Sequence, residues 1–310
     1  MLRYIASRLL QAAFLIVAIT LAVFWILRAT AGDPAKIANP VFARPDVVEQ
    51  YRKMFGTDKP RLQQLWEFVS GIPHGNFGTS FRFQRPVFGL ILDRLPATLA
   101  LAGIALLIAV TTALVLGVLS ARRPGSFIDW LAGTLAMFGQ SAPAFWVGLM
   151  LIIFISVKGG WLPSGGLSNW EGLVLPAITV ALATLPTELR VLRASMREVL
   201  QQDYVRAARA FGVPAWRIDF VYALRNAFLP LLTVIGVDMG YLLGGVIVTE
   251  VVFNYPGVGQ LALMALQSRD YPLIQGITIL TAGIFVLVNL LVDLLYGVVD
   301  PRIRLASQAE

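Results

Sequence analysis

Few side chains in this sequence can do chemistry, and one of them lies where a charge is costly. Asp238 interrupts an apolar run from Ala227 to Thr249, about halfway along it. A carboxyl group in a long apolar segment is expensive to bury, so it counts as a functional candidate. It would line a substrate path, pair with an arginine or attract a cationic amine. An interhelical hydrogen bond in a water-accessible cavity explains it equally well.

Several kinds of catalytic and metal chemistry lack the residues they need. The chain has no cysteine and a single histidine, His74. It therefore offers no disulfide, thiolate zinc site or multi-histidine metal site of its own. No Gly-x-x-x-x-Gly-Lys-[Ser/Thr] phosphate-binding loop occurs, so the sequence predicts neither ATP hydrolysis nor a bound cofactor in this chain. An intramembrane protease is disfavoured because His74 lies outside the apolar runs.

The segment Glu188–Asn226 is the densest short cluster of arginines, with seven of them. In its middle part, alanines at 207, 208 and 210 favour a short helix. Gly212 suits the position after a helix, where φ is positive, and Pro214 suits the first turn of a following helix. The pattern therefore predicts a short helix, a sharp turn and a second short helix.

The first of these short helices has a chemistry of its own. Its alanine face is flanked by Arg206 and Arg209. A short helix with small side chains fits a groove on a partner protein. An amphipathic loop that anionic lipid holds by its arginines is an equally good interpretation. The residues alone leave both alternatives open.

The overall composition indicates whether the chain folds in water or in a membrane. Of the 310 residues, 57% are hydrophobic and only 14% are charged. Soluble domains carry about 25% charged residues, and disordered chains need low hydrophobicity and high charge. The composition therefore excludes both classes and indicates an all-α polytopic membrane protein. The net charge of +7 indicates cytoplasmic loops rather than nucleic-acid binding.

Six apolar runs are long enough, or nearly so, to cross a membrane as helices of about 20 residues. Pro143 predicts a kink or break in the third run, and the first run is expected to be a retained helix rather than a cleaved signal peptide. The fourth run is the shortest. The six expected spans are 9–27, 95–120, 130–157, 172–187, 227–249 and 273–292.

The distribution of basic residues predicts the orientation of these spans. Short loops that carry arginine stay in the cytoplasm. Four cytoplasmic candidates carry at least two arginines each: the N-terminus, the loop after the second span, the loop 188–226 and the C-terminal tail. We therefore expect both termini and 188–226 in the cytoplasm, and the long loop 29–94 outside.

The fifth span also carries a stripe of small residues. Gly236, Gly240 and Gly244 recur every fourth residue, which lets two helix backbones approach closely. Asp238 lies about 200° around the helix from Gly236. One face of this span is thus expected to pack against a neighbour, and the opposite face to carry the acid.

Several stretches together resemble one protein family. The segment Arg206-Ala207-Ala208, Gly212 and Leu229-Pro230 resembles the EAA motif of binding-protein-dependent ABC importer permeases, in the dipeptide, oligopeptide and nickel branch. Arg206 occupies the position of the motif's leading glutamate. Similar stretches across nearly the whole chain are Gly32-Asp33-Pro34, Gly75–Phe81, Leu95–Leu99, Glu250–Gly259 and Asp300–Arg304.

The resemblance implies a type I ABC importer transmembrane domain with six helices. It implies a first helix and outer loop over 1–94 and a permease core over 95–304. The motif would form a coupling helix that docks on an ATPase subunit. The residues implied in coupling are Arg206, Ala207, Ala208, Arg209, Gly212 and Pro214. Asp238 is assigned to the translocation path.

The resemblance also implies partners and a location. The partners are a second homologous permease, two ATP-binding cassette subunits that hold ATP and Mg²⁺, and an extracytoplasmic substrate-binding protein. The location is a bacterial or archaeal cytoplasmic membrane, with lipid around the spans. Short peptides are ranked first as substrate and nickel or a metal chelate second, while glutathione-like compounds are also carried in this branch. An ion-coupled secondary transporter is the remaining alternative. It is disfavoured because the spans lack the chain of several acids that a proton relay needs.

Overall fold

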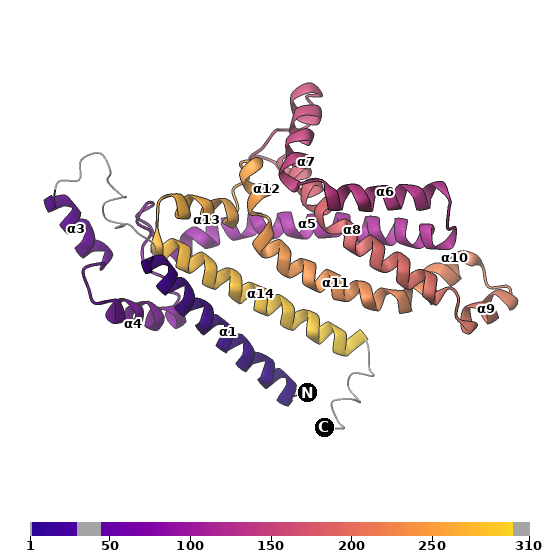
Figure 1. Cartoon of the computed structure of the whole chain (residues 1–310), viewed down its shortest axis with the longest axis horizontal. Coiled ribbons are helices and arrows are strands. Elements are labelled where there is room, and N and C mark those ends of the chain that lie inside the picture. Colours follow the sequence, from indigo (N-terminus) through magenta and orange to yellow (C-terminus); the bar gives the residue numbers. More distant parts are fainter. Residues whose placement is uncertain (1, 30–44, 300–310) are drawn as a thin grey trace. The chain divides into compact units, whose positions relative to one another are not determined.

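The computed structural model describes residues 2–29 and 45–299 of the chain, and nearly all of them are helical. Within this part, β structure is limited to an isolated antiparallel bridge between Thr79 and Pro86. The all-α prediction is therefore confirmed. The long helices are α1 (Leu2–Ala29), α5 (Val87–Arg122), α6 (Phe127–Ser141), α8 (Val174–Val199), α11 (Leu224–Gly245) and α14 (Tyr271–Val299) (Figure 1).

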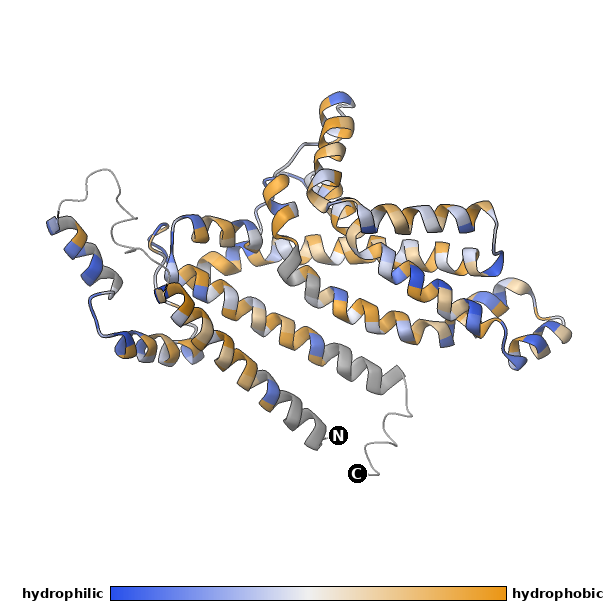
Figure 2. Cartoon of the chain, in the orientation of Figure 1, coloured by the Kyte–Doolittle hydropathy of each residue, from blue (hydrophilic) through white to orange (hydrophobic). Residues whose placement is uncertain are grey.

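Shorter helices connect the long ones. They are α3 (Pro45–Phe55), α4 (Arg61–Gly71), α7 (Ala144–Leu151), α9 (Asp203–Ala210), α10 (Ala215–Arg217), α12 (Ile247–Val252) and α13 (Val258–Gln267). π-Helical stretches extend α7 as far as Lys158 and join α10 to α11 through Ile218–Ala223. Figure 2 shows hydrophobic residues along α5, α7 and α14, while hydrophilic residues gather on α9 and the adjoining end of α8.

Four helices of the described residues are long and apolar enough to cross a membrane, or up to five if one bent pair is a single span. The bent pair is α6 with α7, at 109°. Pro143 lies at this bend and precedes α7, with its φ at −61° and ψ at 134°. The predicted break at Pro143 is thus confirmed, because proline cannot continue the hydrogen bonding of α6. The count of six spans stays a prediction.

The fourth expected span ends later than the sequence suggested. The apolar run stops at Thr187, but α8 continues to Val199. The segment 188–226 is therefore mostly helical, and the non-helical connections lie around residues 200–202 and 211–214. Hydropathy falls at Glu188 because polar residues begin there, whereas helical hydrogen bonding continues through them.

The structure divides into two compact units, each with its own core. The first unit comprises the described residues of 1–98 and 256–287, and the second those of 99–255 and 288–310. In the first unit, Phe77, Val87, Ile91 and Leu273 are buried in one hydrophobic cluster. The Thr98 hydroxyl accepts a 2.8 Å hydrogen bond from the backbone N–H of Val258 at the start of α13.

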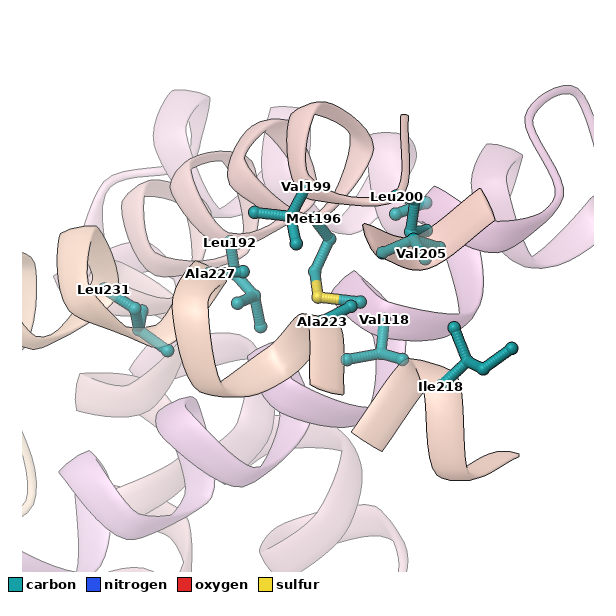
Figure 3. Packing of buried hydrophobic residues seen from close by; sticks show 11 residues of the cluster. Val118, Leu192, Met196, Val199, Leu200, Val205, Ile218, Ala223, Ala227 and Leu231 are labelled. Carbon is teal, nitrogen blue, oxygen red and sulfur yellow. The ribbon is translucent and has the colours of Figure 1, made fainter. Parts of the chain in front are cut away.

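The core of the second unit joins α5, α8 and α11 to the short helix α9. Figure 3 shows Met196 of α8 near the centre of this cluster, with Val118, Val205 and Ala223 around it. α8 packs against both α6 and α11, and it is the most buried of the candidate spans. α8 thus connects the packing of the membrane helices with the segment that follows it.

Candidate functional site

The segment 203–217, called the coupling segment below, forms the predicted helix, turn and helix. The backbone N–H of Gly212 donates to the Arg209 carbonyl (3.0 Å), and that of Val213 donates to the Ala208 carbonyl (3.1 Å). These two bonds make a Schellman motif at the end of α9. Gly212 has φ of +73°, a conformation that costs glycine little and other residues more.

The second helix begins one residue later than predicted. Pro214 was expected in the first helical turn, but it occupies the capping position before α10, with ψ at 140°. Its carbonyl accepts hydrogen bonds from the N–H groups of Arg217 (3.0 Å) and Ile218 (3.2 Å). The missing N–H of proline costs nothing here, because a capping residue donates no bond within the helix.

α9 packs against the core chiefly through Val205. Val205 is fully buried in the cluster that Met196 and Ile218 share. Ala208 is half-buried and leans on the same cluster, whereas Ala207 is exposed. The two alanines that the sequence grouped together therefore have different roles in packing, and Ala207 is the one on the free face.

The free face of the coupling segment also carries large aromatic side chains. Phe211 is 87% exposed and Trp216 is 57% exposed. Arg206 and Arg209 are exposed beside them. Aromatic and arginine side chains are the types enriched at binding hot spots. Our reading of the sequence did not single out Phe211 or Trp216, although two aromatic residues in an arginine-rich loop were a signal for them.

A hollow of about 850 Å³ lies next to α9 and is lined by residues of α8, α9 and α11. The Tyr204 hydroxyl accepts a 2.8 Å hydrogen bond from the side-chain amide of Asn226 across it. Leu229 and Pro230, which contributed to the sequence motif, line the same hollow. The second end of the motif therefore lies at the same hollow as Tyr204 in the first turn of α9.

Asp238 lies on α11 and is half-buried, with its Oδ2 atom buried and without a hydrogen-bond partner. The charged group next to it is Glu188 of α8, not an arginine. The Glu188 residue is fully buried, and no N–H or hydroxyl donor of the described residues reaches its carboxyl oxygens, so its polar neighbour is the carboxyl group of Asp238. The sequence placed Glu188 in a solvated loop, which is wrong because α8 continues through it.

The small-residue stripe lies on α11 as predicted. Gly236 and Gly240 are buried, and Gly244 belongs to the same helix. Asp238, on the other side of the helix, is more accessible than these two glycines. Because Asp238 faces Glu188 of α8, its side of α11 is packed as well, and the separation of a packing face from an acidic face stays a prediction.

An ion cluster that the sequence did not reveal joins α6 to α8. Asp129 in the first turn of α6 accepts hydrogen bonds from Arg197 (3.2 Å) and from the backbone N–H of Gly125 (2.9 Å). Arg193 lies 2.5 Å from the other carboxyl oxygen. Asp129 is only 8% exposed, so its charge is removed from water and neutralised by arginines. Within residues 2–29 and 45–299, no group of three metal-binding side chains occurs.

Known proteins similar to this chain agree with the fold and the motif. Residues 113–305 match the family model of the binding-protein-dependent transport system inner membrane component, and residues 1–102 match the N-terminal model of the same system. A probable peptide ABC transporter permease, y4tP of Sinorhizobium fredii, is 38% identical over 97% of this chain and 99% of its own. The glutathione transport system permease GsiC of Escherichia coli K12 is 38% identical over 98% of this chain and 99% of its own.

Solved structures of lower identity share the fold. The inward-facing methionine ABC transporter MetNI has a TM-score of 0.57 at 18% identity, covering 68% of this chain and 96% of that one. An amino acid ABC transporter with histidines has a TM-score of 0.51 at 17% identity, and the match covers 76% of this chain and 98% of that one. The helical fold is therefore that of type I ABC importer permeases. Together with the family models, this shows that the chain belongs to the binding-protein-dependent transport system inner membrane components.

Proposed function

We propose that this chain is a permease subunit of an ATP-driven importer for short peptides and forms half of its translocation pathway. A second homologous permease forms the other half. Two ATPase subunits bind ATP and Mg²⁺ and drive alternating access, and an extracytoplasmic binding protein delivers the substrate. This chain transmits the motion of the ATPases and does not hydrolyse ATP itself, in line with the missing phosphate-binding loop.

The observation that carries this proposal is the coupling segment. A short helix is anchored to the membrane helices through buried Val205, while Ala207 and Phe211 face outward. An exposed aromatic side chain on a rigid, core-anchored element is a feature of docking surfaces. Force on this face would pass through Val205 to α8 and α11, which share its cluster.

The proposed orientation follows from the coupling segment. If the ATPases dock there, the segment lies in the cytoplasm. Both termini then lie in the cytoplasm as well, and the segment 45–86 lies outside. The arginine content of the loops supports this arrangement. The cytoplasmic membrane of a bacterium or archaeon is the location that the relatives support.

The names of the relatives support a peptide-like substrate. One similar protein is a probable peptide permease, and another belongs to a glutathione transport system. Glutathione is itself a short peptide, so both names point to the same chemical class. The decisive measurement is uptake by cells that express the chain with its partners, compared among a labelled dipeptide, glutathione and nickel. Uptake of nickel alone would contradict the peptide assignment.

The coupling role is tested with Gly212→Val. The β-branched side chain strains the left-handed backbone at Gly212, although nothing lies within 4 Å of an added Cβ atom. We expect uptake to fall at least about tenfold, with weaker ATPase binding in pull-down from mild detergent. The matched control is Gly160→Val, because Gly160 also has positive φ (+65°) and open space but lies in the segment that follows α7 and Lys158.

A second variant removes the docking face without straining the backbone. Phe211→Ala truncates a side chain that is 87% exposed, so the fold should keep its stability. We expect ATPase binding to weaken about tenfold or more if Phe211 is a hot spot. Normal uptake and normal ATPase binding in both Gly212→Val and Phe211→Ala would contradict the coupling assignment. Purification of the chain with no ATPase partner would favour a secondary transporter.

A further inference from the structure

A cavity of about 250 Å³ lies within the first unit, among α1, α4, the segment that follows it and the first turns of α14. Polar side chains converge on it from each of these elements. They are Arg28, Gln64, Glu67, Asn76 and Gln275. The aromatic residues Phe68, Phe77, Phe81 and Tyr271 form much of the remaining wall. None of these residues belongs to the coupling segment or to the acid pair described above.

Arg28 is held so that part of its guanidinium group stays available. Its guanidinium carbon stacks 3.5 Å from the ring centre of buried Phe24, and its Nε donates to Gln64 Oε1 at 3.0 Å. Gln64 is fixed in turn by a 2.8 Å hydrogen bond to the Lys59 carbonyl. Apart from a long contact of Nη1 with the Phe24 carbonyl (3.4 Å), the Nη atoms make no hydrogen bond within the described residues.

Gln275 adds a donor that nothing in the cavity satisfies. The residue is only 3% exposed, and its Nε2 atom is buried without a hydrogen-bond partner. Buried amide groups normally have a hydrogen-bond partner, because leaving one unpaired destabilises the fold. Gln275 lines the same cavity as Arg28, and a rotation of its amide would turn this covered donor toward the cavity. Two N–H donors of different elements, one of them charged, therefore await an acceptor.

The acids nearby are already engaged. Both oxygens of Glu67 accept hydrogen bonds from Lys59 at 2.8 Å, which lowers the pKa of Glu67 and keeps it ionised. Asp270, fully buried next to α14, accepts from the Ser80 hydroxyl (2.5 Å) and from the backbone N–H of Arg82 (3.1 Å). Within the described chain, no carboxylate forms an ion pair with Arg28. The cavity thus has the donors for an anion and keeps its own acids occupied.

We propose that this cavity binds the carboxylate group of a small ligand, with Arg28 and Gln275 as its donors. The planar guanidinium group matches the two oxygens of a carboxylate, and such charge-assisted bonds are among the strongest. A volume of about 250 Å³ falls just below the range of about 300–1,000 Å³ that holds drug-sized ligands. The cavity therefore suits one or two amino-acid residues. The identification of this ligand as the free C-terminus of a short peptide rests on the proposed function.

The test is calorimetric titration of the purified full-length chain in lipid nanodiscs with alanyl-alanine and with its C-terminal amide. The free acid should bind and the amide should not, because the amide lacks the carboxylate. Arg28→Gln should weaken binding of the free acid about 10- to 100-fold, the size of a lost charged hydrogen bond. Gln275→Leu should weaken it about fivefold, the size of a lost neutral one.

Two further variants keep the result interpretable. Arg85→Gln is the matched control, since Arg85 is an exposed arginine of the same unit that pairs with exposed Asp93 and does not line the cavity. It should bind alanyl-alanine like the wild type. Arg28→Lys retains the charge and loses the planar fork. It should fold as the wild type does and bind more weakly, which separates recognition from loss of structure.

Three results would overturn the proposal. Equal binding of the acid and its amide would exclude carboxylate recognition, and equal loss in Arg85→Gln and Arg28→Gln would exclude this cavity. Because binding is measured on the purified chain and peptide uptake in cells, uptake without carboxylate-dependent binding would reject the cavity and leave the proposed function intact.

Discussion

Two helix contacts of α8 contain buried acidic side chains, and the acids have opposite surroundings. One acid lies between arginines, and the other lies beside a second acid. At the contact with α6, Asp129 lies between Arg193 and Arg197, and its carboxyl oxygens are fully engaged. At the contact with α11, Glu188 faces another acid, Asp238, and no N–H or hydroxyl donor of the described residues reaches its carboxyl oxygens. One helix therefore takes part in a cluster whose acid is neutralised by two arginines and in a pair of two acids without a counter-charge, although the Nε atoms of Arg193 and Arg197 make no hydrogen bond themselves.

This difference separates a structural role from a functional one. A buried ion pair with its hydrogen bonds made resists the loss of either partner. A buried carboxyl group without partners costs stability, and its removal relieves that cost. We therefore interpret the Asp129 cluster as a clamp between α6 and α8. Glu188 and Asp238 are the polar groups whose presence packing alone does not explain.

The largest effect on stability is expected for Asp129→Ala. The substitution leaves two arginine side chains, 26% and 37% exposed, without their counter-charge. Because these groups keep some water, we expect a loss of about 2–3 kcal/mol in the free energy of unfolding, at the low end for a buried pair. Denaturant unfolding in detergent, followed by tryptophan fluorescence, measures it. Asp203→Ala is the control, since Asp203 is 97% exposed in its pair with Arg206 and should change stability little.

The close approach of the α6 backbone to α8 at Gly139 provides a second test of the α6–α8 contact. A Cβ atom on Gly139 of α6 would clash with the Leu182 carbonyl oxygen and the Pro186 ring of α8. Gly139→Val should therefore lower the free energy of unfolding by about 2 kcal/mol through overpacking. Gly133→Val on the same helix meets no atom within 4 Å, so it should be nearly neutral. Similar losses in both variants would show that α6 and α8 are not packed as described.

Glu188→Leu is expected to act in the opposite direction. It replaces a fully buried carboxyl group that lacks partners with an apolar side chain of similar size. The free energy of unfolding should rise by about 1 kcal/mol, since buried charges replaced by apolar groups are often stabilising. A loss of 2 kcal/mol or more would mean that Glu188 has a structural partner, and the contrast with Asp129 would fail.

The smallest effect on stability is expected for Asp238→Asn. The half-buried side chain keeps its shape, so unfolding should change by less than about 0.5 kcal/mol. Uptake should nevertheless fall if the acid lies on the translocation path. Unchanged uptake and an unchanged substrate range would remove Asp238 from the path and leave it as a tolerated polar residue of α11.

Local features of the fold were accessible from the sequence. The turn at Gly212 followed from helix propensity and the preference of glycine for positive φ, and the break before α7 followed from Pro143. The end of the fourth span did not follow, because hydropathy falls at Glu188 while α8 continues to Val199. A fall in hydropathy marks where apolar residues give way to polar ones. It does not mark the end of a helix, because backbone hydrogen bonding continues through polar residues.

The sequence by itself determined the membrane class, the family resemblance and the conformation of the coupling segment, since each depends on composition or on neighbours within a few residues. The tertiary structure decided which charges are satisfied. It joined Asp129 to two arginines of α8, placed Glu188 beside Asp238, and brought Arg28 and Gln275 to one cavity. These partners lie far apart in the chain, and a side chain's own sequence neighbours do not specify which distant group will neutralise it.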